Sequence, residues 1–153
     1  MNVYKRLESL GIALTEPAIP AASYVPFVRS GDLVFLSGHL AKKDSKILVG
    51  RLGNGITTAQ GAQVARAIAV DLLGTLHAAI GDLNLLSRIV KLTSMVSSTA
   101  EFSEQHLVAN GASDLLAEVF ADRGVHARSA FGIAQLPLGA CVEIELIVET
   151  RPA

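Results

Sequence analysis

The last segment of the chain, residues 141–149, constrains the fold most strongly. Its sequence, CVEIELIVE, alternates with a period of two, which is the side-chain period of a β-strand. Valine, isoleucine and leucine at positions 142, 144, 146 and 148 share one side, and glutamates at 143, 145 and 149 share the other with Cys141 and Ile147. We therefore expect helices over the apolar side and another subunit against the mixed side.

Periodicity and turn residues predict the elements before this strand. They indicate a short amphipathic helix at 3–10, an extended arm at 15–23, and two strands at 24–38 around a turn at Ser30-Gly31-Asp32. Residues 39–57 are polar and rich in glycine, which favours a loop with one weak strand near 47–49.

Two helices are expected in the second half of the chain. The first begins after a capping box of Thr57 and Gln60 and ends at Gly81. The second runs from an N-cap at Ser103 to about Arg123 and is weakened by an internal glycine, Gly111. A strand at 87–98 separates the helices, and residues 128–135 and 141–149 are predicted to form a closing hairpin.

The predicted order is β-β-α-β-α-β-β, an α+β fold with two helices packed on one face of a sheet of at least five strands. A length of 153 residues suits a single domain, 1–153, in which 1–23 form an N-terminal arm and a short helix. Half of the residues are hydrophobic and only 18% are charged. Because two helices cover only one face, the surplus apolar surface is expected in a subunit interface.

Composition also excludes several classes of protein. Uninterrupted apolar runs are too short for a membrane span, and the first ten residues do not resemble a secretory signal. The single cysteine, Cys141, excludes an intrachain disulfide and suggests a cytoplasmic protein. A net charge of −1 without a basic stripe gives little support to nucleic-acid binding.

Few residues suggest catalysis by their spacing alone. Ser37 lacks a nucleophile elbow, Cys141 has no histidine nearby in sequence, and the four histidines show no metal-ligand spacing, so no metal is expected. The stretch GRLGNGIT at 50–57 precedes a helix and could hold an anion. It lacks the ending of a P-loop, and a flexible loop is the favoured interpretation.

Arg128 stands before a long uncharged segment, and the next charge after it is Glu143. An arginine that enters an apolar strand needs an anion, because an unpaired buried charge is costly. Glu143 or Glu145 across the predicted hairpin could form a structural ion pair with it. Alternatively, Arg128 is free to grip a ligand carboxylate with two hydrogen bonds. Spacing alone does not choose between these interpretations.

Three segments resemble the YjgF/RidA family, and together they cover nearly the whole chain. The C-terminal segment ARSAFGIAQLPLGACVEIELIVE is similar to the family signature, including the spacing from Arg128 to Glu143. The segments SYVPFVRSGDLVFLSGHL and DLNLLSRIVKLTSMVSS resemble the family's first hairpin and its central strand. The N-terminal residues resemble a bacterial subgroup with a longer lead-in.

The resemblance implies a chorismate-mutase-like fold and a homotrimer whose sheets form a central barrel, with sites in clefts between subunits. It also implies hydrolysis of reactive enamine and imine intermediates, such as 2-aminoacrylate, to 2-keto acids and ammonia, without a cofactor. By this resemblance Arg128 binds the substrate carboxylate and Glu143 orients the attacking water. Tyr24 lines the cleft, and Gly38 brings its backbone close to the substrate.

Several positions depart from the family pattern around the pocket. His39 stands where glutamine is common, Val25 and Pro26 follow the tyrosine in place of serine and glutamine, and Ala130 stands where many members carry cysteine. Asn110 corresponds to a cleft asparagine in one possible register. These changes bear on the substrate more than on the reaction class.

Two other functions remain open from the sequence. A non-catalytic protein could bind or sense a small carboxylate in the same cleft, which the altered pocket rim permits. The older family name, endoribonuclease L-PSP, suggests RNA cleavage, against which the charge balance argues.

Overall fold

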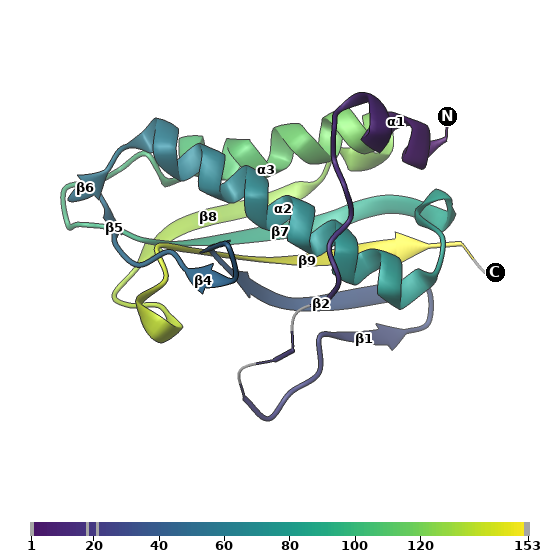
Figure 1. Cartoon of the computed structure of the whole chain (residues 1–153), viewed down its shortest axis with the longest axis horizontal. Helices are drawn as coiled ribbons and strands as arrows, with labels where there is room; N and C mark the ends of the chain where they lie inside the picture. Colours follow the sequence, from purple (N-terminus) through teal and green to yellow (C-terminus); the bar gives the residue numbers. More distant parts are fainter. Residues whose placement is uncertain (1, 18, 21, 152–153) are drawn as a thin grey trace.

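A five-stranded mixed sheet forms the base of the molecule, and helices cover one of its faces (Figure 1). The computed structural model describes residues 2–17, 19–20 and 22–151. Across the sheet the strands are β1 (Phe27–Ser30), β2 (Leu33–Leu40), β9 (Val142–Thr150), β7 (Leu86–Ser97) and β8 (Ala127–Ile133). Neighbours are antiparallel except β7 and β8, which are parallel. The predicted α+β fold is confirmed.

The predicted closing hairpin is wrong, because β7 lies between β8 and β9. The helix after β7 returns the chain along the sheet, so β8 runs parallel to β7 and takes its outer side. Residues 134–141, which include the short 3₁₀ turn η3 (Pro137–Gly139), then carry the chain to the other side of β7. There β9 pairs with both β7 and β2 and becomes the central strand.

The long helix α2 (Thr58–Ile80) has the ends that its sequence predicts. Thr57 and Gln60 form a reciprocal capping box, and Gly81 follows the helix with a φ of 76°. The helix is long and apolar enough by length and composition to cross a membrane, as are many core helices. In this structure 44% of its most apolar window is buried.

The second helix, α3 (Gln105–Phe120), is shorter than predicted and continues into the 3₁₀ turn η2 (Ala121–Gly124). Its N-cap is Glu104 rather than Ser103, and no side chain caps it. Gly111 lies where α3 crosses α2, and a β-carbon there would overlap the carbonyl oxygen of Ala62. The glycine that weakens the isolated helix therefore allows the two helices to touch.

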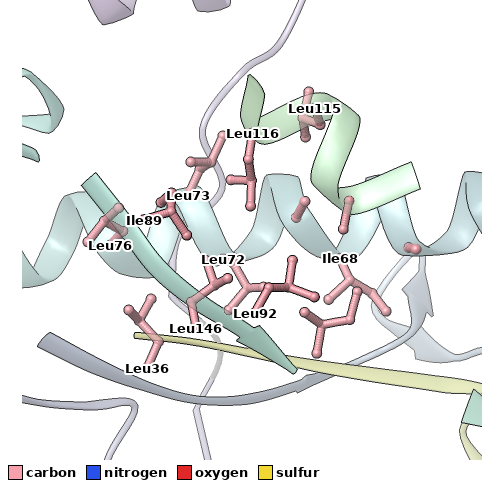
Figure 2. Close-up of a cluster of buried hydrophobic side chains, with 14 of the residues drawn as sticks. Leu36, Ile68, Leu72, Leu73, Leu76, Ile89, Leu92, Leu115, Leu116 and Leu146 are labelled. Atoms are coloured by element: carbon pink, nitrogen blue, oxygen red, sulfur yellow. The ribbon is translucent and has the colours of Figure 1, made fainter. Parts of the chain in front are cut away.

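The hydrophobic core fills the space between these helices and the sheet (Figure 2). Leu72 and Leu76 of α2, Leu116 of α3, and Leu92 and Leu146 of the strands all belong to this core (Figure 2). On β7 the regular alternation of a strand is interrupted, since Ile89 and Leu92 are both fully buried. The pairing with β9 shifts register between Ile89 and Lys91, and this irregularity turns both side chains inward.

Smaller elements surround this frame. The predicted N-terminal helix is confirmed as α1 (Val3–Ser9), and a 3₁₀ turn, η1 (Leu83–Leu85), precedes β7. The loop predicted before α2 contains two small pairs, β3 (Lys42–Lys43) with β4 (Lys46–Ile47) and β5 (Arg51–Leu52) with β6 (Gly55–Ile56).

The start of the arm predicted at 15–23 packs against the second half of α2. A β-carbon at Gly74 would overlap the carbonyl oxygen of Thr15, so the arm and the helix are in close contact. The Thr15 hydroxyl donates to Asp71 at 3.2 Å. Residues 18 and 21 of the arm lie outside the described residues.

Large apolar side chains remain exposed on the sheet face that the helices leave open. Phe35 of β2 and Phe131 of β8 are 41% and 44% exposed, and Val28 of β1 pairs with Phe35 on the same face. Glu143 and Glu145 of β9 share this face with them. It is the mixed side expected from the alternation of the last strand.

Candidate active site

Arg128 lies on the edge strand β8 with its side chain turned toward α3. It pairs with the buried Leu92, so it belongs to the helix-covered face of the sheet. Its Nη1 donates to Asn110 Oδ1 at 2.8 Å and Ser113 Oγ at 3.1 Å, and its Nη2 donates to the His106 carbonyl oxygen at 3.1 Å. Three uncharged acceptors from one helix thus orient the guanidinium.

The structural ion pair considered for Arg128 does not form among the described residues. Glu143 and Glu145 lie on β9, two strands away and on the opposite face. Among the described residues, the salt bridge that forms joins Arg66 of α2 to Glu118 of α3 at 2.8 Å. The cation of Arg128 is therefore held by dipoles, and its charge is left available to an anion from outside.

Hydrogen bonds continue from Arg128 through Ser113 to His126. Ser113 lies 2.9 Å from Nε2 of His126, and Nδ1 of His126 lies 2.6 Å from the Gly124 carbonyl oxygen. Sequence reasoning missed both side chains. The available signal was that His126 precedes Arg128 by two residues, the period that places strand side chains on one face.

Glu143 occupies the open face of β9. It pairs with Met95 of β7 and Leu40 of β2. Gly38 leaves room for its side chain, because a β-carbon at that position would overlap the Oε1 atom of Glu143. Partial burial raises the pKa of the Glu143 carboxyl, and the nearby charge of Glu145 raises it further. A base with a raised pKa accepts a proton from water more readily near neutral pH.

An apolar cavity of about 110 Å³ lies at the end of β2, and Gly38, against which the Glu143 side chain lies, is one of its lining residues. Tyr24 and Gly38 line it together with Leu40, Ile47 and Leu138. Ser37 also reaches its edge, and its hydroxyl donates to the Val25 carbonyl oxygen at 2.6 Å. The Ser37 hydroxyl is thus used in a structural hydrogen bond, as its position in a strand suggests.

His39 lines the same cavity, but its ring is engaged inside the chain. Its Nδ1 lies 2.9 Å from the Ser37 carbonyl oxygen and its Nε2 2.7 Å from the buried Thr75 hydroxyl of α2. Burial lowers the pKa of His39. With 8% of its surface exposed and both nitrogens bonded, the imidazole itself has no free polar atom for a substrate.

The predicted site residues fall into two groups within one chain. Arg128 and Asn110 form one group between β8 and α3, and their contact places Asn110 beside the guanidinium. Tyr24, Gly38 and Glu143 form the other around the end of β2, on the open face. A single chain therefore does not bring Arg128 and Glu143 to one substrate.

The remaining candidates are structural in the described part of the chain. Cys141 is fully buried in the core, and burial raises the pKa of its thiol, which keeps it protonated. Among the described residues, no three histidine, cysteine, aspartate or glutamate side chains are grouped so that they could hold a metal ion. The glycine-rich stretch before α2 forms the short β5 and β6 strands.

The chain is similar in sequence to known proteins over nearly its whole length. The family model described as endoribonuclease L-PSP matches residues 15–150. Protein TCP17 from Trypanosoma cruzi is 46% identical over 150 residues, which cover 97% of this chain and 94% of the relative.

Solved structures share the fold. The crystal structure of Atu1372 from Agrobacterium tumefaciens matches with a TM-score of 0.89 and 44% identity, covering 98% of this chain and 94% of that one. RidA from the Antarctic bacterium Psychrobacter sp. matches with a TM-score of 0.60 and 25% identity, covering 88% and 93% of the two chains.

Proposed function

Because the chain belongs to the endoribonuclease L-PSP family, also known as YjgF/RidA, we propose that it is a deaminase of reactive enamine and imine intermediates. Its substrates are of the 2-aminoacrylate type, and its products are 2-keto acids and ammonia. Arg128 binds the substrate carboxylate, and Glu143 orients the water.

The state of Arg128 is the observation that carries this proposal. A guanidinium has five N–H donors, and α3 takes two on Nη1 and one on Nη2. The Nε–H and one N–H on Nη2 remain for a ligand, and two parallel donors suit a carboxylate. Since its three partners carry no charge, an incoming carboxylate supplies the missing anion.

The chemistry requires little beyond positioning and one base. The substrate imine carbon accepts the oxygen of a water molecule held by Glu143, whose carboxylate takes the water proton as the C–O bond forms. The π electrons of the C=N bond move to the nitrogen, which takes that proton to give a carbinolamine. The hydroxyl proton of the carbinolamine then moves through Glu143 to the nitrogen, and ammonia leaves with the C–N bonding pair as the carbonyl forms. The raised pKa of Glu143 suits a group that accepts and returns a proton.

A homotrimer provides the geometry that one chain lacks. We propose that Arg128 of one subunit faces Glu143 of its neighbour across a cleft. Two observations support this: the two groups lie on opposite faces of one sheet, and the open face carries exposed Phe35 and Phe131. Such apolar surface is typical of subunit interfaces.

Ammonia and keto-acid release tests the proposal directly. With 2-aminoacrylate generated by a serine dehydratase, we expect Arg128→Ala to lose about 2–4 kcal/mol of transition-state stabilisation, or roughly 30- to 1000-fold in kcat/KM. Arg151→Ala, which removes an exposed arginine beyond the end of β9, is the charge-matched control and should retain activity. Equal rates for wild type and Arg128→Ala would refute the assignment.

Assays on the same purified protein distinguish the proposal from two other functions. RNA cleavage, which the name of the matched family suggests, predicts nuclease activity that persists through purification and falls with rising salt. A carboxylate sensor predicts ligand binding that depends on Arg128 without turnover of any imine.

A further inference from the structure

We propose that Ser113 and His126 are positioning residues, which hold Arg128 in the orientation that receives the substrate carboxylate. This inference rests on the proposed function, because it assigns a role toward the same ligand. Neither residue is expected to touch the substrate. They act through a chain of hydrogen bonds that runs from the backbone of η2 to the guanidinium.

Chemistry fixes the direction of each bond in this chain. The Gly124 carbonyl oxygen can only accept, so Nδ1 of His126 carries the proton in the 2.6 Å contact. In the neutral ring Nε2 is then an acceptor, and the Ser113 hydroxyl donates to it across 2.9 Å. The Ser113 oxygen is left with its lone pairs, one of which accepts from Nη1 of Arg128 at 3.1 Å.

The surroundings of His126 keep it neutral. Burial lowers the pKa of His126, the bond to Gly124 opposes this shift, and the positive charge of Arg128 lowers the pKa further. A neutral imidazole is the form that accepts the Ser113 proton, whereas a protonated ring would donate at both nitrogens. The charge of Arg128 therefore favours neutral His126, and neutral His126 in turn orients the serine that binds Arg128.

Orientation matters because the guanidinium offers its remaining donors along one edge. Asn110 and Ser113 both bind Nη1, and together with the His106 carbonyl they fix the plane of the group. Without Ser113, Nη1 retains only Asn110 and Nη2 retains the His106 carbonyl, so the guanidinium loses one of its three contacts and its plane is less restricted. A carboxylate would then have to order the arginine as it binds, and immobilising one long side chain corresponds to about a three- to tenfold loss of affinity.

A pair of substitutions separates the two nitrogens of His126. The amide oxygen of His126→Gln reaches the position of Nε2 and can accept from Ser113. The shorter His126→Asn reaches the position of Nδ1, so it can donate to Gly124 but leaves Ser113 without its acceptor. Ser113→Ala removes the same link from the other side and serves as a second variant if the asparagine protein does not fold.

Two readouts are needed, binding of the product pyruvate by calorimetry and steady-state hydrolysis of 2-aminoacrylate. We expect His126→Asn and Ser113→Ala to raise both the Kd for pyruvate and the KM about three- to tenfold, with kcat within about twofold of wild type. His126→Gln should restore both constants to near wild-type values. Melting temperatures of all variants report any change in stability separately.

The outcomes distinguish this inference from the function on which it rests. If the glutamine and asparagine variants lose affinity equally, or if Ser113→Ala binds pyruvate like wild type, the positioning role is refuted. If Arg128→Ala binds pyruvate like wild type, the carboxylate-binding function itself is refuted. A fall in kcat with unchanged KM would also contradict positioning, since it would mean that His126 acts in the chemical step.

Discussion

At the scale of single residues, the neighbours of Glu143, the candidate base, set the pKa of its carboxyl. Gly38 makes room for the Glu143 side chain, and half-burial against β2 and β7 disfavours its charged form. Glu145, two residues further along the same face, adds a like charge. Both influences raise the pKa of Glu143, in the direction that a base for a neutral water molecule requires.

The influence of Glu145 can be measured in the pH dependence of hydrolysis. Glu143 must be ionised to accept a proton, so kcat/KM should fall as pH drops through its raised pKa. Glu145→Gln removes the neighbouring negative charge, lowers the pKa of Glu143, and should move this acidic limb to lower pH. Glu101→Gln, at an exposed position before α3, should leave the profile unchanged. A limb that stays in place in Glu145→Gln would show that another group controls it.

Arg128 and Glu143 were predicted from the sequence, but their placement relative to each other was not. Their spacing matched a family signature, which is a local property of the chain. The face on which each side chain lies depends on strand order, and the insertion of β7 between β8 and β9 changes it. Ser113 and His126 escaped notice because a serine within a helix and a histidine before a strand have many ordinary roles.

At the scale of elements, the contact between α2 and α3 supports the site. Gly111 of α3 lies against the Ala62 backbone, and Asn110 and Ser113, which bind Arg128, flank that contact. The Arg66–Glu118 salt bridge joins the same two helices further along. The distance between the helices therefore affects both the stability of the core and the placement of the acceptors for Arg128.

Gly111→Ala tests this contact, and the two relevant effects have opposite signs. Alanine favours a helix over glycine by about 1 kcal/mol. Its methyl group would, however, overlap backbone that cannot rotate away, and overpacking of this kind costs about 1–3 kcal/mol or more. We expect net destabilisation in urea unfolding, together with a raised KM. Gly61→Ala in α2 is the comparison, because its methyl group would meet only side-chain atoms, of Leu52 and Val108, and not backbone, so we expect a smaller loss of stability.

The elements themselves were largely predictable, and the errors arise from contacts between segments that are distant in sequence. The capping box of α2 and the turn before β2 are short-range signals, and both are confirmed. The interrupted alternation on β7 depends on its register with β9, a contact distant in sequence. The short connection before β9 suggested a hairpin, but the parallel placement of β8 depends on the whole β7–α3–β8 crossover.

At the scale of the whole molecule, the two residues of the proposed site lie apart within one chain. Arg128, the proposed carboxylate-binding residue, lies under α3 at the edge strand β8, and Glu143, the proposed base, lies on the open face near β2. A closed ring of identical subunits joins unlike surfaces at each interface, so every interface can unite one residue from each neighbour. The exposed phenylalanines on the open face provide apolar surface for such a ring.

Mixing two inactive variants tests whether the site is shared. Arg128→Ala keeps Glu143, and Glu143→Gln keeps Arg128, so neither homotrimer has an intact cleft. In mixed trimers formed by co-expression of equal amounts, a cleft is intact when an unmodified Arg128 faces an unmodified Glu143, which random assembly gives in about one quarter of clefts. We therefore expect about one quarter of wild-type activity from the mixture.

The same two proteins purified separately and combined without subunit exchange are the control. If the mixed trimers, verified by mass spectrometry, are as inactive as their parents, both residues act within one chain and the shared site is excluded.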